Sequence, residues 1–330
     1  MTCQGKVSIN DTSGAEAGAD MGAEVRAALA GDPPSLPCKY FYDDRGSRLF
    51  QEITRLPEYY QTRTEESVLE RVADEVVAAV GARELVELGS GSGRKIRLLL
   101  DAMARAGHLE RCVLFDINER DLEQSVRALG RDYPQARVRG VVGDFTQGFA
   151  GVGPGGGRIA ALFGGTIGNL HPRDVPAFLA RVADLLEEGD GFLVGIDLVK
   201  DKRVLEAAYN DAAGVTARFN RNILQVMNDR LGADFDPSAF DHVAFYDEQN
   251  AWIEMRLRAR RAQGVRIPGA GVDLRLAPGD EIRTEISCKY SRASLEAKLP
   301  GTGLRLGQWH ADQANRFALA LLVRDPEARR

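Results

Sequence analysis

The sequence predicts an α/β protein, in which a parallel sheet with helices on both faces is interrupted by a second, smaller α+β unit. Three observations point to this fold. Short apolar runs alternate with helical patterns from residue 85 to residue 198, as in successive βαβ units. A glycine-rich turn at residues 89–93 joins the first run to the first helix, which is typical of nucleotide-binding sheets. After Lys200 the alternation stops, and 330 residues are enough for two domains.

In the first thirty residues, the sequence predicts only one short helix. Residues 1–20 are rich in Ser, Gly, Ala and Asp and are expected to form a flexible leader. Residues 21–30 predict a short helix, which the Asp-Pro-Pro sequence at 32–34 ends. The chain has no basic-then-apolar signal pattern and no stretch near the roughly 20 apolar residues of a membrane span.

Two further helices are predicted before the sheet. Ser47 is a suitable N-cap for a helix with apolar residues at helical spacing over 49–56, and Pro57 ends it. Thr62 and Glu65 have the spacing of a capping box, which predicts a helix running to about residue 80. Both helices precede the alternating pattern.

From residue 85 the sequence alternates between strand and helix. Strands are predicted where short apolar runs are flanked by turn residues, and helices where apolar residues recur every three or four positions. The predicted strands are Leu85–Leu88, Cys112–Ile117, Arg137–Val142, Ile159–Phe163 and Gly191–Leu198. The predicted helices between them are Lys95–Arg105, Asp121–Arg131 and Asp174–Leu186.

The rest of the chain predicts an α+β unit and then a return to the sheet. Two helical patterns are followed by three strands: Val204–Ala213, Thr216–Leu231, Phe240–Phe245, Trp252–Ala259 and Glu281–Tyr290. The last forty residues predict a helix and two strands, the second at Phe317–Val323. The arginines between Arg256 and Arg261 alternate with apolar residues, so we expect them on a solvated strand edge.

Composition and charge exclude several classes of protein. With 44% hydrophobic and 28% charged residues, a net charge of −5 and no concentrated basic face, the chain is not expected to bind nucleic acid. The four cysteines form no CxxC pair and the four histidines no HExxH motif. We therefore expect reduced thiols, no metal site, a cytoplasmic location, and a monomer without a membrane partner.

The glycine-rich turn predicts a nucleotide site. The sequence Gly89-Ser90-Gly91-Ser92-Gly93 lets the backbone approach a ligand closely, and the following helix offers free N–H groups. Asp116, about 25 residues later, ends the second strand, where a carboxylate can accept both hydroxyls of a ribose. Asp144 follows the third strand and is placed to bind an adenine amino group, with Phe145 beside the ring.

The residues around the turn distinguish between two nucleotides. NAD-binding turns prefer GxGxxG and place a pyrophosphate at the helix N-terminus. Here the sequence is ELGSGSG, and the acidic Glu87 near the strand end repels a pyrophosphate but suits a cationic methionine group. S-adenosylmethionine is therefore the expected ligand, and an NAD-dependent oxidoreductase is the disfavoured alternative.

Several unusual strings carry a family likeness. They are KYFYD at 39–43, LPEYYQTRTE at 56–65, ELGSGSG at 87–93, GGTIGNL at 164–170, DLVKD at 197–201, GVTA at 214–217 with FN at 219–220, and TEISCK at 284–289. From about residue 36 onward the chain resembles the histidine-specific, S-adenosylmethionine-dependent methyltransferases of ergothioneine biosynthesis. The resemblance implies a Rossmann-like class I methyltransferase domain at residues 64–199 and 290–330. It also implies an α+β substrate-binding domain at residues 21–63 and 200–289.

The same resemblance implies individual site residues. Those expected to hold the cofactor are Gly89, Lys95, Asp116, Asp144 and Phe145. Those expected to hold the carboxylate and backbone of the substrate are Tyr59, Asn169 and Tyr209. Tyr42 and the Gly164 carbonyl would face the amine. Glu285 and Ser287 would recognise the imidazole, with Met255 beside them.

Tyr42 is the candidate catalytic residue. The amine must attack in its neutral form, whereas the amino group of a free amino acid is mainly protonated at pH 7. Binding must therefore favour the neutral form, or a tyrosine or water must carry the proton away. The rest of the reaction needs alignment above all. The resemblance implies successive methylation of L-histidine, through the mono- and dimethylated forms, to hercynine. Aromatic faces and carbonyl oxygens can accommodate the permanent positive charge of this product.

The sequence departs from the family at three places, and two alternatives remain. Gly165 stands where the family commonly has Ser, Cys38 replaces a usual Pro, and residues 153–157 resemble a lengthened loop. A relative acting on tryptophan or tyrosine is disfavoured by Glu285 and Met255, because an indole would need both side chains to shrink or lose charge. A non-catalytic adenosylmethionine-binding protein is disfavoured by the retained substrate residues.

Overall fold

The structure is a computed structural model that describes residues 7–11, 21–91 and 93–325, and the chain divides into two compact units. Unit 1 consists of Met1–Gly14, Gln61–Val199 and Lys289–Arg330. Unit 2 consists of Ala15–Tyr60 and Lys200–Cys288. Among the described residues, no helix combines the length and apolar character needed to cross a membrane.

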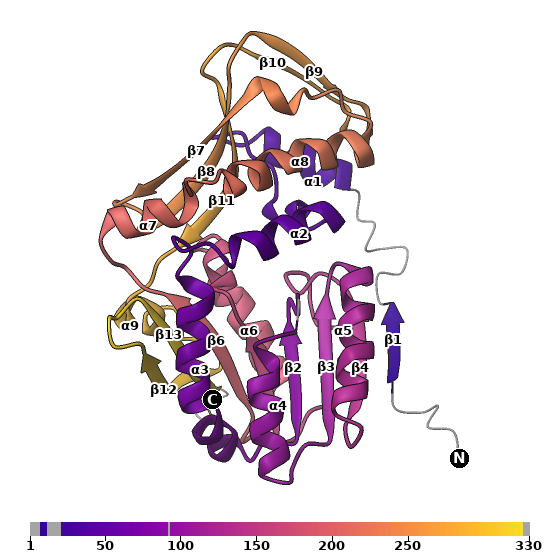
Figure 1. Ribbon diagram of the computed structural model, residues 1–330, viewed down its shortest axis with the longest axis vertical. Coiled ribbons are helices and arrows are strands. Elements are labelled where there is room, and N and C mark those ends of the chain that lie inside the picture. The colour runs from indigo at the N-terminus through magenta and orange to yellow at the C-terminus, as the bar shows by residue number, and fades with distance from the viewer. Residues whose placement is uncertain (1–6, 12–20, 92, 326–330) are drawn as a thin grey trace. The chain divides into compact units, whose positions relative to one another are not determined.

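Unit 1 contains an eight-stranded mixed sheet in the order β1-β4-β3-β2-β5-β6-β13-β12 (Figure 1). The strands are β1 Val7–Asp11, β2 Glu84–Leu88, β3 Arg111–Asp116, β4 Arg137–Val142, β5 Arg158–Leu162, β6 Gly191–Asp197, β12 Leu304–Ala311 and β13 Phe317–Arg324. The strands from β1 to β6 pair in parallel, but β13 pairs antiparallel with both β6 and β12. The parallel sheet predicted from residues 85–198 is therefore confirmed, and β12 and β13, joined by a short connection, add an antiparallel hairpin at its edge.

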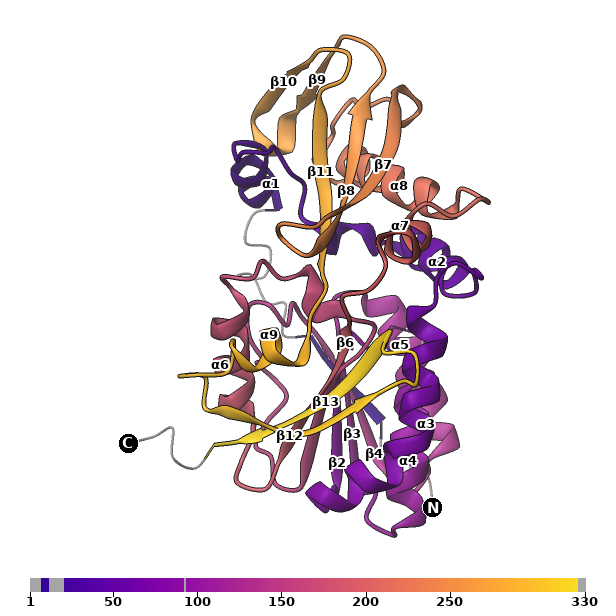
Figure 2. The ribbon, with the colours of Figure 1, turned by 90° about the vertical axis from the view of Figure 1, so that its left-hand side faces the viewer.

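Helices cover both faces of this sheet, as the sequence predicts. Figure 2 shows α3, α4 and α5 on one face and α6 on the other. Their bounds, with those of the shorter helices η2 and α9, are α3 Gln61–Val80, α4 Ile96–Arg105, α5 Glu119–Asp132, η2 Thr166–Asn169, α6 Val175–Leu185 and α9 Arg292–Glu296. Every residue of β2, β5 and β6 is buried, which explains why the central strands read as continuous apolar runs.

The flexible leader expected over residues 1–20 is wrong for residues 7–11. These residues form β1, which extends the sheet by pairing in parallel with β4, from Val7 opposite Val138 to Asp11 opposite Val142. Gly130 on α5 leaves room for this strand, because a Cβ there would lie 2.6 Å from the Val7 side chain. Residues 1–6 and 12–20 of the expected leader lie outside the described residues.

Unit 2 is built around a three-stranded antiparallel sheet in the order β11-β8-β7, with α8 running along it (Figure 1). A second pair, β9 and β10, which the sequence analysis missed, extends the connection between β8 and β11. The strands are β7 Phe240–Asp247, β8 Trp252–Ala259, β9 Gln263–Ile267, β10 Val272–Leu276 and β11 Glu281–Cys288. The helices are α1 Met21–Leu29, η1 Cys38–Phe41, α2 Asp44–Ile53, α7 Lys202–Tyr209, α8 Val215–Leu231, η3 Pro237–Ala239 and η4 Pro268–Ala270.

The prediction that Ser47 caps α2 is wrong. The N-cap is Asp43, whose Oδ1 accepts a hydrogen bond from the Gly46 amide at 2.7 Å. Gly46 allows α2 to begin before Ser47, because a Cβ at position 46 would collide with the Phe41 carbonyl. The helix therefore begins as soon as the preceding turn ends.

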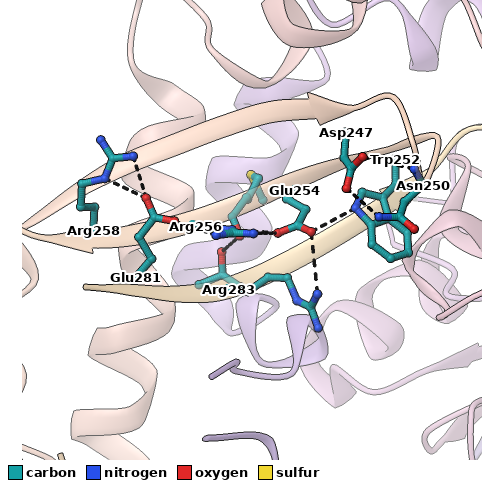
Figure 3. A network of polar contacts seen from close by, with 10 residues as sticks. Asp247, Asn250, Trp252, Glu254, Arg256, Arg258, Glu281 and Arg283 are labelled. Carbon is teal, nitrogen blue, oxygen red and sulfur yellow. Dashed lines mark hydrogen bonds and ion pairs between the residues drawn. The ribbon is translucent and has the colours of Figure 1, made fainter. Parts of the chain in front are cut away.

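The arginines of β8 do not lie on a strand edge either, since β8 is the central strand of its sheet. One face of β8 and β11 carries a ladder of ion pairs (Figure 3). Glu281 lies between Arg258 and Arg256, at 2.7 and 2.8 Å. Glu254 accepts hydrogen bonds from Arg256 at 2.7 Å and from the Trp252 indole at 3.0 Å. The alternating charges of this segment therefore pair across strands within the sheet.

Candidate functional site

The glycine-rich turn of unit 1 has the backbone that the sequence predicts for a ligand cradle. Gly89, Gly91 and Gly93 have φ angles of +71°, +46° and +61°, which residues with a Cβ rarely adopt. The Gly89 amide donates to the Phe115 carbonyl at 2.7 Å, which ties the turn to the end of β3. Ser92, in the same turn, lies outside the described residues.

Asp116 lies directly beside this turn. Its Oδ2 accepts from the Gly91 amide at 3.0 Å, and its Oδ1 accepts from the Asn118 amide at 2.9 Å. Burial raises the pKa of this carboxyl group, and the two amide hydrogen bonds oppose that rise. The carboxylate is thus held at the end of β3, where the sequence analysis expects a ribose.

Asp144 and Phe145 follow the next strand along the sheet, β4. Asp144 Oδ1 accepts from the Thr146 amide at 2.8 Å and from its hydroxyl at 2.6 Å. Phe145 packs edge-on against Phe178, with ring centroids 6.2 Å apart, and its ring lies within 3.5 Å of where a Gly89 Cβ would be. Because β2, β3 and β4 are neighbours, their carboxyl ends bring Gly89, Asp116 and Phe145 to one edge of the sheet.

The buried Glu87 carboxylate distinguishes between the two candidate ligands, S-adenosylmethionine and a dinucleotide. Its side chain is 4% exposed, and no hydrogen-bond donor among the described residues reaches its Oε2. Burial raises its pKa well above the usual range, while the Lys95 ammonium opposes that rise. An unsatisfied buried carboxylate is costly unless a ligand compensates it, and a cationic amino group does so whereas a pyrophosphate does not. The residues therefore fit S-adenosylmethionine.

Glu65 has a different role from the capping box that the sequence predicts. Helix α3 begins at Gln61, so Thr62 lies inside it, and the Glu65 side chain is fully buried away from the helix start. Its carboxylate accepts from the Gly164 amide at 2.8 and 2.9 Å and forms an ion pair with Lys95. A Cβ at Gly195 on β6 would collide with Glu65 Oε1.

Glu65 therefore connects two of the expected site residues, Lys95 and Gly164. Burial raises its pKa, and the Lys95 ammonium is the largest opposing influence. This role is not visible in the local sequence, because the partners lie 30 and 99 residues away. The available signal was that Glu65 closes one of the family strings.

The turn after β5 carries Gly164 and Asn169. Gly164 and Gly165 are both left-handed, with φ angles of +76° and +68°, and the short helix η2 that follows ends at Asn169. Gly165 is the position where the family commonly has Ser, and its positive φ suits glycine. Both expected substrate contacts of this turn belong to unit 1.

The other expected substrate residues belong to unit 2, where Tyr209 and Ser287 meet. Tyr209 ends α7, and its hydroxyl donates to Ser287 Oγ on β11 at 2.9 Å. Both side chains are buried. This contact places the residue expected to bind the substrate backbone next to one expected to recognise the imidazole.

A β-bulge decides which face of β11 carries Glu285. Arg283 is opposite Arg256, but Glu285 is opposite Met255, so Thr284 is the extra residue. Arg283 therefore lies on the ion-paired face of Figure 3, whereas Glu285 and Ser287 lie on the opposite face, beside Met255 and Ile253. Regular alternation from Ile282 would have placed Glu285 on the ion-paired face.

Tyr42 and Tyr59 belong to an aromatic cluster in unit 2. Tyr42 lies 5.7 Å from Phe50 and 5.9 Å from Phe219, and Phe50 lies 6.2 Å from Tyr59, between ring centroids. Tyr59 is buried, and Tyr42 is half-buried. Several aromatic faces gathered in this way can stabilise a cation without a counterion.

Within each unit the structure brings some of the expected residues together. Unit 1 gathers Gly89, Asp116 and Phe145 at one sheet edge, and links Lys95 to Gly164 through Glu65. In unit 2, Met255 and Glu285 form a cross-strand pair. No group of three or more His, Cys, Asp or Glu residues suited to a metal ion is found over the residues that the structure describes.

Comparison with known proteins gives a consistent result. A family model described as "Histidine-specific methyltransferase, SAM-dependent" matches residues 21–324. A histidine N-alpha-methyltransferase of Mycolicibacterium smegmatis is 48% identical over 301 residues, which cover 91% of this chain and 94% of the relative. One of Mycobacterium tuberculosis is 42% identical over 97% of this chain and its own full length. Ergothioneine biosynthesis protein 1 of Schizosaccharomyces pombe is 31% identical over 64% of this chain and 29% of its own length.

Proposed function

The chain belongs to the family of histidine-specific, S-adenosylmethionine-dependent methyltransferases, and we propose that it methylates the α-amino group of L-histidine successively to hercynine, in ergothioneine biosynthesis. The observation that carries the proposal is the family match from residue 21 to residue 324. The unsatisfied Glu87 carboxylate supports the choice of cofactor. Unit 1 would act as the methyltransferase domain and unit 2 as the substrate-binding domain.

The residues that would hold the cofactor lie in unit 1. When bound, S-adenosylmethionine supplies an electrophilic methyl group on a sulfonium. Gly89 would let the backbone approach it, Asp116 would accept from the ribose hydroxyls, and Asp144 with Phe145 would bind the adenine. Lys95 would contribute a positive charge held in place by Glu65. These contacts fix the position of the donor, and alignment is the main requirement of the reaction.

The residues that would hold the substrate have three tasks. Tyr59, Asn169 and Tyr209 would bind the carboxylate and backbone of histidine, and Glu285 with Ser287 would accept from or donate to the imidazole, with Met255 packed beside it. Tyr42 and the Gly164 carbonyl would face the amine, and the Tyr42 hydroxyl would accept a hydrogen bond from it and pass a proton on to water before each methyl transfer. The aromatic cluster around Tyr42 and Phe50 would tolerate the growing positive charge.

The proposed partners are small molecules only. The substrates are L-histidine and its mono- and dimethylated forms, with S-adenosylmethionine as the methyl donor. We propose that the protein works as a monomer in the cytoplasm, without nucleic acid or membrane. Mass and scattering measurements in solution with and without ligands would test the monomer.

Product analysis tests the reaction itself. The protein would be offered each of the twenty amino acids with S-adenosylmethionine, and the products identified by mass spectrometry. Histidine should yield the trimethylated product, and phenylalanine, leucine and tryptophan should react slower by orders of magnitude, because unpaired buried polar groups penalise an analogue without the imidazole. Preference for another amino acid would contradict the histidine assignment.

A variant sharpens the specificity part of this test. Glu285→Ala should lower histidine turnover and reduce its preference over phenylalanine, since the imidazole loses its acceptor. Glu281→Ala is the matched control, because Glu281 lies on the same strand but on the ion-paired face. Equal loss of preference in both variants would contradict the role of Glu285.

A further inference from the structure

A buried polar network in unit 2 connects Thr284 with Tyr209. Its centre is Asn220 on α8, which is 0% exposed. Asn220 Oδ1 accepts from the Thr284 hydroxyl at 2.6 Å, and its Nδ2 donates to the Arg256 carbonyl at 3.0 Å. The same Nδ2 lies 2.9 Å from Nδ1 of His242. The amide is satisfied at both ends, which leaves it a single orientation.

His242, on β7, extends the network to α7. Its Nε2 lies 2.9 Å from the Tyr209 carbonyl oxygen, which can only accept, so Nε2 carries the hydrogen. In a neutral ring Nδ1 then accepts from Asn220. Burial lowers the pKa of His242, and the hydrogen bond to Tyr209 opposes this; among charged neighbours, Arg221 lowers it and Asp211 raises it. The neutral ring is thus the form that fits.

Both ends of the network adjoin residues of the proposed substrate site. Thr284 is the extra residue of the bulge, and its hydroxyl also lies 3.1 Å from the Met255 carbonyl. Glu285 follows directly, on the face that the bulge selects. At the other end the network holds the backbone of Tyr209, whose hydroxyl donates to Ser287. The network and this hydroxyl contact therefore link the same two elements, α7 and β11, at two points.

Building on the proposed function, we propose that Asn220 and His242 are positioning residues for imidazole recognition. They fix the bulge at Thr284 and the carbonyl of Tyr209. They thereby determine the face of β11 on which the Glu285 side chain lies and the position of the Tyr209 hydroxyl. They act through these residues without touching the substrate. The network itself is uncharged, and Glu285 is the acidic residue on its face of β11.

Replacement of Asn220 tests this directly. Asn220→Leu keeps the branched shape of the side chain, although it is somewhat larger, and removes every hydrogen bond of the amide. We expect the ratio of kcat/KM for histidine to that for phenylalanine to fall about 10- to 100-fold, because Glu285 and Tyr209 lose their fixed positions. The affinity for S-adenosylhomocysteine, measured by calorimetry, should stay unchanged, since the cofactor residues belong to unit 1.

Asn228→Leu is the matched control. Asn228 is on the same helix and also holds backbone, with bonds to the amide and carbonyl of Phe235 at 2.9 and 2.8 Å. It has no bond to Thr284 or His242, so its loss should lower stability but leave the histidine preference intact. A merely structural role for Asn220 would give the same result in both variants.

Two further substitutions keep the proposal testable if Asn220→Leu does not fold. Thr284→Val removes only the hydroxyl that holds the bulge and should reduce the histidine preference in the same way. His242→Gln keeps a donor for the Tyr209 carbonyl and should retain more of the preference than His242→Leu. If the folded variants keep the wild-type preference, the proposal is overturned. If the wild-type protein does not methylate histidine, the proposed function fails first, and this inference fails with it.

Discussion

The two units hold their proposed binding residues by opposite electrostatic means. Unit 1 uses a charged group, the buried Glu65 carboxylate, which binds the Gly164 amide and the Lys95 ammonium. Unit 2 uses neutral groups, the Asn220 amide and the His242 imidazole. A buried charge depends on its partner, because desolvation costs several kcal/mol per ion if the pair is broken. A neutral network tolerates burial better but fails when one member becomes charged.

The comparison also concerns backbone geometry. Unit 1 shapes its site with glycines in the left-handed region, such as Gly89 and Gly164, which are recognisable in the sequence. Unit 2 shapes its proposed site with a bulge at Thr284, a residue with strong β-propensity that carries no local sign of the irregularity. Four predictions test the comparison, in decreasing order of expected effect.

The largest effect is expected for Glu65→Gln. The amide removes the negative charge and leaves the Lys95 ammonium without its partner, so unit 1 should lose about 3–5 kcal/mol of stability. Denaturant unfolding combined with hydrogen exchange of unit 1 amides measures this. Glu66→Gln is the control, because Glu66 pairs with the largely exposed Arg94 and its loss should cost less than about 1 kcal/mol. Equal effects of the two variants would show that the Glu65 carboxylate is not the critical group.

Asp116→Ala should weaken cofactor binding rather than unfold the protein. Loss of the acceptor for two ribose hydroxyls should cost roughly 1.5–3 kcal/mol of binding free energy, as for hydrogen bonds to a charged group. Calorimetry with S-adenosylhomocysteine measures the change. An unchanged affinity would rule out the ribose contact, and a parallel loss of unfolding free energy would point instead to the hydrogen bond with Gly91.

Glu87→Gln should change stability and binding in opposite directions. The buried Glu87 carboxylate lacks a donor at Oε2 among the described residues, so its replacement should stabilise the ligand-free protein by about 1 kcal/mol. Binding of S-adenosylhomocysteine should weaken by a similar amount, because its amino group loses a carboxylate partner. A thermal shift and a calorimetric titration on the same sample check both signs. A simple loss of stability would show that Glu87 is already satisfied in the free protein.

The smallest effect is the pH dependence, which differs in sign between His242 of unit 2 and the two buried glutamates of unit 1. Burial lowers the pKa of His242 in the folded state, so its contribution to stability is present above the unfolded value of about 6.5 and is lost as pH falls. Burial raises the pKa of Glu65 and Glu87, so their contribution is present below about 4.5 and is lost as pH rises through the folded values. Unit 2 should therefore weaken between pH 7 and pH 5, by at most about 1.4 kcal/mol per pH unit for one proton.

Hydrogen exchange at several pH values separates the two units in this measurement. His242→Gln, which cannot take up the proton, should flatten the slope for unit 2 and leave that for unit 1 unchanged. A slope of unit 2 that persisted in His242→Gln would contradict this prediction. Unit 1 contains His310, whose pKa is also lowered by burial, so some loss of stability on acidification is expected there as well.

The parallel strands and their bounds were the part of the fold that the sequence predicted best. Leu85–Leu88 and Arg137–Val142 lie within or match the observed β2 and β4, because strands buried on both faces appear as apolar runs bounded by turn residues. Strand β1 was missed since five residues near the terminus gain their structure only from β4. The hairpin β12-β13 was expected as two strands, but its antiparallel pairing with β6 follows from packing rather than from local sequence.

The site divides in the same way. The position of Asp116 beside the glycine-rich turn could be predicted from its spacing, because the carboxyl ends of neighbouring parallel strands meet at one edge of a sheet. The role of Glu65 could not be predicted in this way. The same local sequence suits a capping box and a buried carboxylate that holds other residues, and only the position of Gly164 distinguishes the two. The roles of the substrate residues in unit 2 came from the family likeness alone, and they stay predictions.

By itself, the sequence determined the α/β class, the cradle of glycines between β2 and α4, and the family to which the chain belongs. These depend on local preferences: apolar periodicity, positive φ at glycine, and strings of adjacent residues. Only the tertiary structure decided that Glu65 serves Lys95 and Gly164, and that Glu285 lies beside Met255 and away from the ion-paired arginines. The physical reason is that one extra residue in a strand reverses every later side chain, and cross-strand partners, absent from the local sequence, decide where that residue is accommodated.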